Sequence, residues 1–92
     1  MPRYLVERFI PNAGELTAKE LQTISQQILR VQGQFQAGIQ WVFTVFTADG
    51  MVDLYIADDE QIIKEHARLC GLPIQRMSEI SAVIGPKMND LH

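Results

Sequence analysis

The hydrophobic residues of this chain change their spacing in a fixed order, and this order limits the folds that the chain can adopt. Alternation over short runs predicts strands, whereas spacing of three and four residues predicts helices. Strand-like spacing covers residues 3–9, the hairpin 39–57 and residues 76–84, and helix-like spacing covers residues 17–35 and 58–70. The order β-α-β-β-α-β is typical of the α+β ferredoxin-like sandwich, in which one antiparallel sheet carries both helices on one face.

Local signals predict where the two helices begin and end. Thr17 and Glu20 form a capping box at the start of the first helix, with a hydroxyl at the N-cap and a carboxylate three residues later. Asp58 is the expected N-cap of the second helix. Gly71 should end that helix in a left-handed conformation, and Pro73 prevents its continuation.

Asp49-Gly50 predicts the turn of the hairpin, since both residues tolerate the positive φ of a two-residue type I′ turn. That turn would pair Ala48 with Met51. Of the two hairpin faces, we expect the more apolar one to lie under the helices. It consists of Ile39, Trp41, Phe43, Val45, Val52, Leu54 and Ile56.

The opposite face of the hairpin would then carry large side chains that the helices do not cover. These are Val42, Phe46, Met51 and Tyr55. A contiguous apolar stripe of this size on a small domain indicates an interface. We therefore expect a homodimer, assembled in the manner of a dimeric α/β barrel.

The length and charge of the chain exclude several classes of protein. The 92 residues make one domain, with a core over about residues 3–84 and a polar tail at 85–92. The net charge is −3 and the basic residues are scattered, which argues against nucleic-acid binding. Neither a signal peptide nor a membrane-spanning run is visible, and the one cysteine fits a reducing compartment. A cytoplasmic location without membrane contact is the expectation.

His66 and Cys70 are the chemically distinctive pair in the second predicted helix. Their spacing of four residues places both on the apolar face of that helix, one turn apart. An imidazole and a thiolate are competent ligands for Zn(II) or Ni(II). The alternative is simple packing, with a hydrogen-bonded histidine beside a cysteine that acts as a small hydrophobic residue.

Three carboxylates form a second constellation, because the expected strand order 4-1-3-2 brings their strands together. If Glu7 points to the open sheet face, it aligns there with Asp53 and Glu79, and the cluster could share a proton or hold a divalent ion. If Glu7 points to the helices, it approaches His66 instead. The alternative is that Arg3, Arg8 or Arg76 neutralises these carboxylates.

Four segments together resemble one bacterial family. They are the opening MPRYLVER, the strand around Trp41, the Tyr55-Ile-Ala-Asp58 entry to the second helix and the ending HARLCGLPIQRMSEI. The chain is similar to the small nickel-binding ferredoxin-like proteins, long described only as a domain of unknown function. The resemblance implies a metal site in which His66 and Cys70 match a histidine pair and Glu7 stands where a strand histidine is expected.

The leading hypothesis is a non-enzymatic homodimer that binds Ni(II) or Zn(II) through His66, Cys70 and Glu7. A different hypothesis is a cofactorless enzyme, a monooxygenase or an isomerase, with His66 as general base. Its pocket would lie between helices and sheet and be lined by Trp41, Phe43 and Ile56. A non-catalytic module for a small molecule, which the sequence does not identify, is the third.

Overall fold

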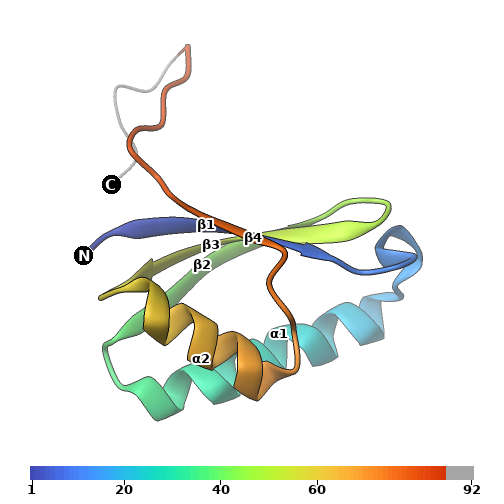
Figure 1. Cartoon of the computed structure of the whole chain (residues 1–92). Coiled ribbons are helices and arrows are strands. Elements are labelled where there is room, and N and C mark those ends of the chain that lie inside the picture. The colour runs from blue at the N-terminus through green and yellow to red at the C-terminus, as the bar shows by residue number, and fades with distance from the viewer. Residues whose placement is uncertain (87–92) are drawn as a thin grey trace.

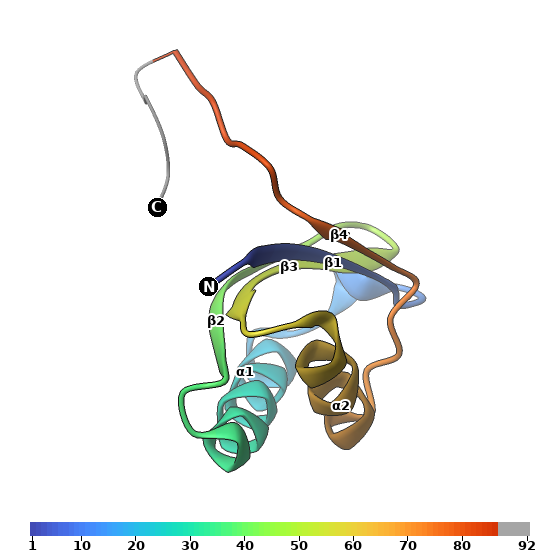
Figure 2. The ribbon, with the colours of Figure 1, turned by 60° about the vertical axis from the view of Figure 1, so that its left-hand side comes forward.

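Two helices lie side by side against one face of a four-stranded antiparallel sheet (Figures 1 and 2). The computed structural model describes residues 1–86. The elements in chain order are β1 (Arg3–Phe9), the 3₁₀ turn η1 (Ala13–Glu15), α1 (Ala18–Gln32), the 3₁₀ turn η2 (Gly33–Phe35), β2 (Ile39–Phe46), β3 (Gly50–Ala57), α2 (Glu60–Cys70) and β4 (Arg76–Glu79). The sheet order β2-β3-β1-β4 confirms the predicted ferredoxin-like sandwich.

The capping signals locate the starts of both helices and the end of α2 to within one residue. Thr17 Oγ1 accepts from the Glu20 amide at 3.2 Å, and Glu20 Oε1 accepts from the Thr17 amide at 3.0 Å, as the capping box predicts. The N-cap of α2 is Asp59 rather than Asp58, because the Asp59 carboxylate accepts from the Ile62 amide at 3.0 Å. Gly71 ends α2 in the left-handed region, with φ of 69°, as expected.

The hairpin turn differs from the prediction. The Thr47 amide donates to the Gly50 carbonyl at 2.9 Å, so Ala48 and Asp49 occupy the turn. Neither Asp49 nor Gly50 has a positive φ, so the turn is not type I′. A glycine is needed at position 50 for another reason. A Cβ atom there would lie 2.5 Å from the carbonyl oxygen of Arg8, where β1 passes close to β3.

The predicted orientation of the sheet is also wrong. The buried face beneath the helices carries Tyr4, Val6 and Arg8 from β1 and Met51, Asp53, Tyr55 and Ala57 from β3. The open face carries Leu5, Phe43, Val45, Val52, Leu54 and Ile56. Side-chain alternation predicts which residues share a face, but not which face the helices cover.

A bulge in β2 exchanges residues between these faces. Trp41 pairs with Tyr55 and Phe43 pairs with Leu54, so Val42 is an extra residue in the ladder. As a result Ile39 and Trp41 join the buried face, whereas Phe43 and Val45 stay on the open face. The prediction had placed all four together.

Strand β4 is shorter than the predicted strand 76–84. Its only neighbour, β1, begins at Arg3, and Glu79 is the last residue in register, opposite Tyr4. One further backbone bond joins the Ile80 amide to the Arg3 carbonyl at 2.8 Å. Residues 80–84 belong to no strand. Of the predicted polar tail, residues 87–92 lie outside the described part of the chain.

Candidate functional site

His66 lies in the core between α2, α1 and the sheet. Its side chain is 1% exposed, and its ring packs edge-on against Tyr55 with 5.6 Å between centroids. Its Nε2 atom is 3.1 Å from the carbonyl oxygen of Ile28 in α1. Because a carbonyl oxygen can only accept, Nε2 carries the hydrogen and donates it. Nδ1 is therefore left with a lone pair.

Cys70 lies one turn further along α2, as the spacing of four residues predicts. Its Sγ atom is 3.8 Å from His66 Nδ1, 3.8 Å from Nε2 and 4.0 Å from the Gln27 carbonyl oxygen. The thiol is half-buried. The structure thus brings His66 and Cys70 together at the contact between the two helices.

The surroundings of this pair set its protonation. Burial lowers the pKa of His66; the hydrogen bond to Ile28 opposes this shift, and the Arg8 guanidinium lowers the pKa further. Burial raises the pKa of the Cys70 thiol, while the charges of Arg8 and Arg30 oppose that shift. At neutral pH the site therefore holds a neutral imidazole beside a protonated thiol.

Glu7, the third predicted ligand, is not brought to this pair. Strand alternation buries Val6 and Arg8 beneath the helices and turns Glu7 to the open face. There Glu7 Oε2 lies 3.7 Å from Arg76 Nε on β4. Among residues 1–86, no group of three or more histidine, cysteine or acidic side chains is arranged to hold a metal ion.

An ion pair between Arg8 and Asp53 lies in the core and was not predicted there. Both side chains are almost fully buried. The Thr44 hydroxyl and the Tyr55 hydroxyl, the latter at 3.3 Å, both donate to the Asp53 carboxylate. Arg8 Nε donates to the Leu72 carbonyl at 3.1 Å, whereas its Nη2 has no hydrogen-bond partner among the described residues. Among residues 1–86, Asp53 is the only carboxylate that forms an ion pair with the buried Arg8 guanidinium.

This network extends across the sheet. Trp41 Nε1 in β2 donates to Thr44 Oγ1 at 2.8 Å, and the chain of polar groups continues through Asp53 in β3 to Arg8 in β1. The Arg8 guanidinium also lies 5.9 Å from the centre of the Tyr55 ring. The sequence does contain a signal for the Arg8–Asp53 pair. Each of these two residues lies on a strand face whose other side chains are apolar, and the two strands are neighbours.

The predicted cluster of Glu7, Asp53 and Glu79 does not form on the open face. Asp53 is beneath the helices, and Glu7 is on the opposite face of the sheet. The alternative considered from the sequence is the correct one for two of the three carboxylates. Arg8 neutralises Asp53, and Arg76 lies beside Glu7.

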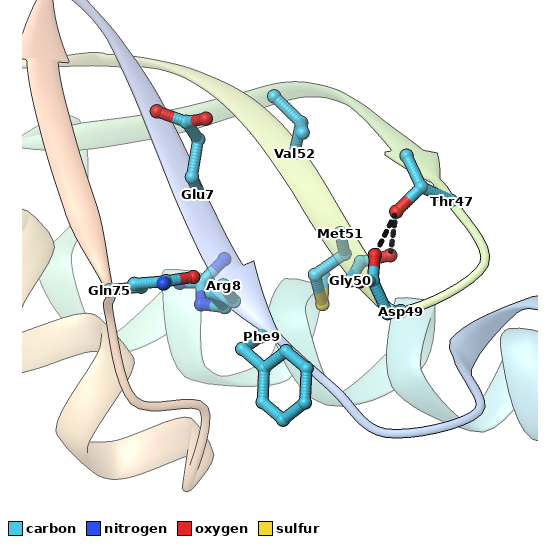
Figure 3. Close-up of a pocket in the computed structure, with 9 residues that line it drawn as sticks. All are labelled: Glu7, Arg8, Phe9, Thr47, Asp49, Gly50, Met51, Val52 and Gln75. Carbon is cyan, nitrogen blue, oxygen red and sulfur yellow. Dashed lines mark hydrogen bonds between the residues drawn. The ribbon is translucent and has the colours of Figure 1, made fainter.

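Two cavities lie against the sheet, and His66 lines neither of them. One of about 310 Å³ lies where β1 and β3 meet the hairpin turn, and Glu7, Asp49 and Gln75 contribute polar groups to it (Figure 3). The other, of about 240 Å³, lies over the open face. The enzyme hypothesis needs Trp41, Phe43 and Ile56 to line one pocket beneath the helices. That expectation is wrong, because Phe43 and Ile56 lie on the open face.

Within residues 1–86, the helices are too short and too polar to cross a membrane.

Comparison with known proteins identifies the family. The family described as "Nickel responsive protein SCO4226-like" matches residues 4–80. The fold is similar to the crystal structure of SCO4226 from Streptomyces coelicolor A3(2), with a TM-score of 0.76 and 10% sequence identity. That similarity covers 89% of this chain and 99% of the other. No curated protein matches. Since the family match extends over most of the sequence, the chain belongs to the SCO4226-like family of nickel responsive proteins.

Proposed function

We propose that this chain is a small homodimeric binding protein, without enzymatic activity of its own, that takes a soft divalent metal ion through His66 and Cys70. The observation that carries the proposal is the hydrogen bond from His66 Nε2–H to the carbonyl oxygen of Ile28. A metal-ligating histidine usually donates its other ring N–H to a carbonyl or carboxylate, which fixes the tautomer and orients the ring. Here that bond leaves Nδ1 available beside a thiol.

The separation of the two donor atoms supports a shared ion. An ion bonded to sulfur at about 2.3 Å and to nitrogen at about 2.0–2.1 Å, with a tetrahedral angle, separates these atoms by roughly 3.5 Å. Sγ and Nδ1 are 3.8 Å apart, which is close to that separation. Imidazole and thiolate are the ligands that Zn(II) and Ni(II) share. The description of the family as nickel responsive favours nickel.

His66 and Cys70 supply only two of the ligands that a metal ion needs. Glu7 lies on the other face of the sheet, and the described residues offer no third histidine, cysteine or carboxylate nearby. We infer that water fills the remaining positions and that binding is weak. The ion would also have to displace the proton of a thiol whose pKa is raised by burial.

The homodimer is proposed from the open face of the sheet. Phe43 and Val45 are large apolar side chains exposed there, and Val52, Leu54 and Ile56 continue the same surface across β3. Exposed apolar patches of this kind mark interaction sites. The face predicted from the sequence as the interface is not available, because Met51 and Tyr55 are buried beneath the helices. The interface is therefore proposed on the other face of the sheet. A cytoplasmic location remains a prediction from the single cysteine.

Isothermal titration of the purified protein with Ni(II) and with Zn(II) tests the metal site. Cys70→Ala should abolish binding. His66→Gln should do the same, while its side-chain amide can still donate to the Ile28 carbonyl and so preserve the packing. Cys70→His should strengthen binding, because it restores the histidine pair that the family resemblance implies. Circular dichroism of each variant shows whether the fold is retained.

Two further variants serve as controls. Glu7→Gln should bind as the wild type does, because Glu7 is separated from His66 by the sheet. His92→Ala should also bind unchanged, which excludes the second histidine of the sequence as the ligand. Equal binding by wild type and a folded His66→Gln variant contradicts the proposed site and leaves His66 as a packing residue.

A further inference from the structure

The pair formed by His66 and Cys70 offers an ion two donors of different kinds. His66 Nδ1 and Cys70 Sγ are 3.8 Å apart. The other ring nitrogen of His66 is already occupied, because it lies 3.1 Å from the Ile28 carbonyl oxygen. Among residues 1–86, no third histidine, cysteine or carboxylate joins them in a group that could hold a metal ion. An ion that is satisfied by two ligands therefore matches this pair better than one that needs four.

The packing around His66 leaves little room for water as a further ligand. The His66 side chain is 1% exposed, and its ring contacts Tyr55 at 5.6 Å and Phe35 at 6.1 Å between centroids. Neither of the two cavities against the sheet is lined by His66 or Cys70. Zn(II) and Ni(II) take four or more ligands. On the His66 side, the missing ligands of a divalent ion would have to displace packed side chains.

Charge also distinguishes between ions at this site. The empty site carries no charge, since the imidazole is neutral and the thiol is protonated. A divalent ion that displaces the thiol proton makes the site positive, whereas a monovalent ion leaves it neutral. Arg8 is a near neighbour, because its Cζ lies 5.9 Å from the centre of the Tyr55 ring that contacts His66. Asp53 compensates the charge of Arg8, and a positive metal site would be a further charge in this core.

We propose that His66 and Cys70 form a site for a monovalent soft ion, Cu(I), and bind it more tightly than Ni(II) or Zn(II). The proposal rests on the ligand pair of the proposed function and specifies the class of ion. Thiolate is the ligand that selects Cu(I), and this ion is stable with two ligands in a line. Binding involves no electron transfer. Cu(I) forms bonds to Sγ and Nδ1, and the thiol proton leaves to the solvent.

The separation of the two donor atoms is compatible with this ion. With bonds of about 2.3 Å to sulfur and about 2.0 Å to nitrogen, a tetrahedral angle separates the donors by roughly 3.5 Å and a linear arrangement by roughly 4.3 Å. The observed 3.8 Å lies between these two values. The distance therefore admits either geometry, and the number of donors and the charge favour the linear one.

Two binding measurements test the proposal. Competition with bicinchoninate under anaerobic conditions gives the Kd for Cu(I), and calorimetric titration gives the Kd for Ni(II). We expect one Cu(I) per chain, with a Kd at least about a hundredfold smaller than that for Ni(II). X-ray absorption at the copper edge should show one sulfur and one nitrogen ligand. Cys70→Ala should lose this site, whereas His92→Ala, which keeps both ligands, should retain it.

The outcomes separate the preference for Cu(I) from the metal site on which it rests. Ni(II) bound as tightly as Cu(I) overturns the preference but leaves the metal site standing. Cu(I) held by two sulfur atoms, at half an ion per chain, overturns the assignment, since the ion would then join two Cys70 residues. Cu(I) binding that survives unchanged in a His66→Gln variant, shown by circular dichroism to be folded, also overturns it. Binding of neither ion overturns both proposals.

Discussion

The two faces of the sheet reverse the expected distribution of polarity. The face beneath the helices contains an arginine, an aspartate and a tyrosine that contact one another, whereas the open face is apolar over most of β2 and β3. Polarity alone therefore does not predict which face is buried. A charged residue is tolerated in the core when its partner lies on the same face of a neighbouring strand, and Asp53 provides such a partner for Arg8.

The two faces of the sheet also differ in what their side chains contact. The polar groups of the buried face are paired mostly with other groups of the same chain, so they stabilise the fold of the single chain. On the open face, Phe43 and Val45 are exposed apolar side chains that no helix covers, and this is the face proposed above as the dimer interface. The following changes test this contrast, beginning with the largest expected effect.

Asp53→Ala should destabilise the domain by about 3–5 kcal/mol, because it leaves the Arg8 guanidinium buried without a counter-charge. A domain of this size often has only about 5–10 kcal/mol in total, so the effect should be visible in urea unfolding. The double variant Arg8→Met/Asp53→Leu should recover much of the loss, since it removes both charges and keeps the volume. A double variant less stable than Asp53→Ala would show that the pair itself, and not the orphaned charge, determines the cost.

Phe43→Ser should weaken the proposed dimer by about tenfold or more, which corresponds to about 1.4 kcal/mol. Its side chain is 45% exposed in the single chain, so the unfolding free energy of the monomer should change less than the association energy. Sedimentation equilibrium gives the first quantity, and urea unfolding at high dilution gives the second. Greater loss in the monomer than in the dimer would mean that this side of β2 belongs to the core.

The stability of the domain should fall as the pH decreases from 7 towards 5. Burial lowers the pKa of His66 below its ordinary value of 6.5, so the unfolded chain binds a proton in this range that the folded chain does not. For one proton the slope is at most about 1.4 kcal/mol per pH unit. His66→Gln should flatten this slope. The lowered pKa values of Glu20 and Glu65, relative to 4.5, affect stability only in more acidic solution. An identical slope in the folded variant would assign the dependence to another group.

Glu7→Gln should have the smallest effect, below about 1 kcal/mol, because exposed ion pairs contribute little. Its partner Arg76 and Glu7 itself are both accessible to solvent. Thermal unfolding at low and at high salt measures the contribution. A loss close to that of Asp53→Ala would mean that the open face also contains a charge that needs its partner.

Much of the fold could be predicted from local patterns. Helix periodicity, the capping box at Thr17 and the glycine at position 71 act within a few residues of themselves, and each was confirmed. The spacing of four residues likewise brought His66 and Cys70 together. These features depend on one helix at a time, so no long-range information was needed.

The features that were predicted wrongly depend on contacts between distant segments. The orientation of the sheet follows from where the helices pack, and the pairing of Arg8 with Asp53 joins residues far apart in sequence. The end of β4 depends on where β1 begins, which the sequence of residues 76–84 cannot indicate. For the same reason the sequence left open which way Glu7 points.

The extra residue at Val42 has a consequence for how this chain can vary in length. Because side chains alternate with a period of two, one unpaired residue lets a single strand supply Trp41 to the helix side and Phe43 to the open side. Deleting Val42 would therefore restore regular alternation and keep Trp41 and Phe43 on their present faces. Deleting a different single residue of β2, with the bulge kept, would exchange the faces of one half of the strand. Single-residue variation in length within β2 should accordingly be confined to the bulge at Val42.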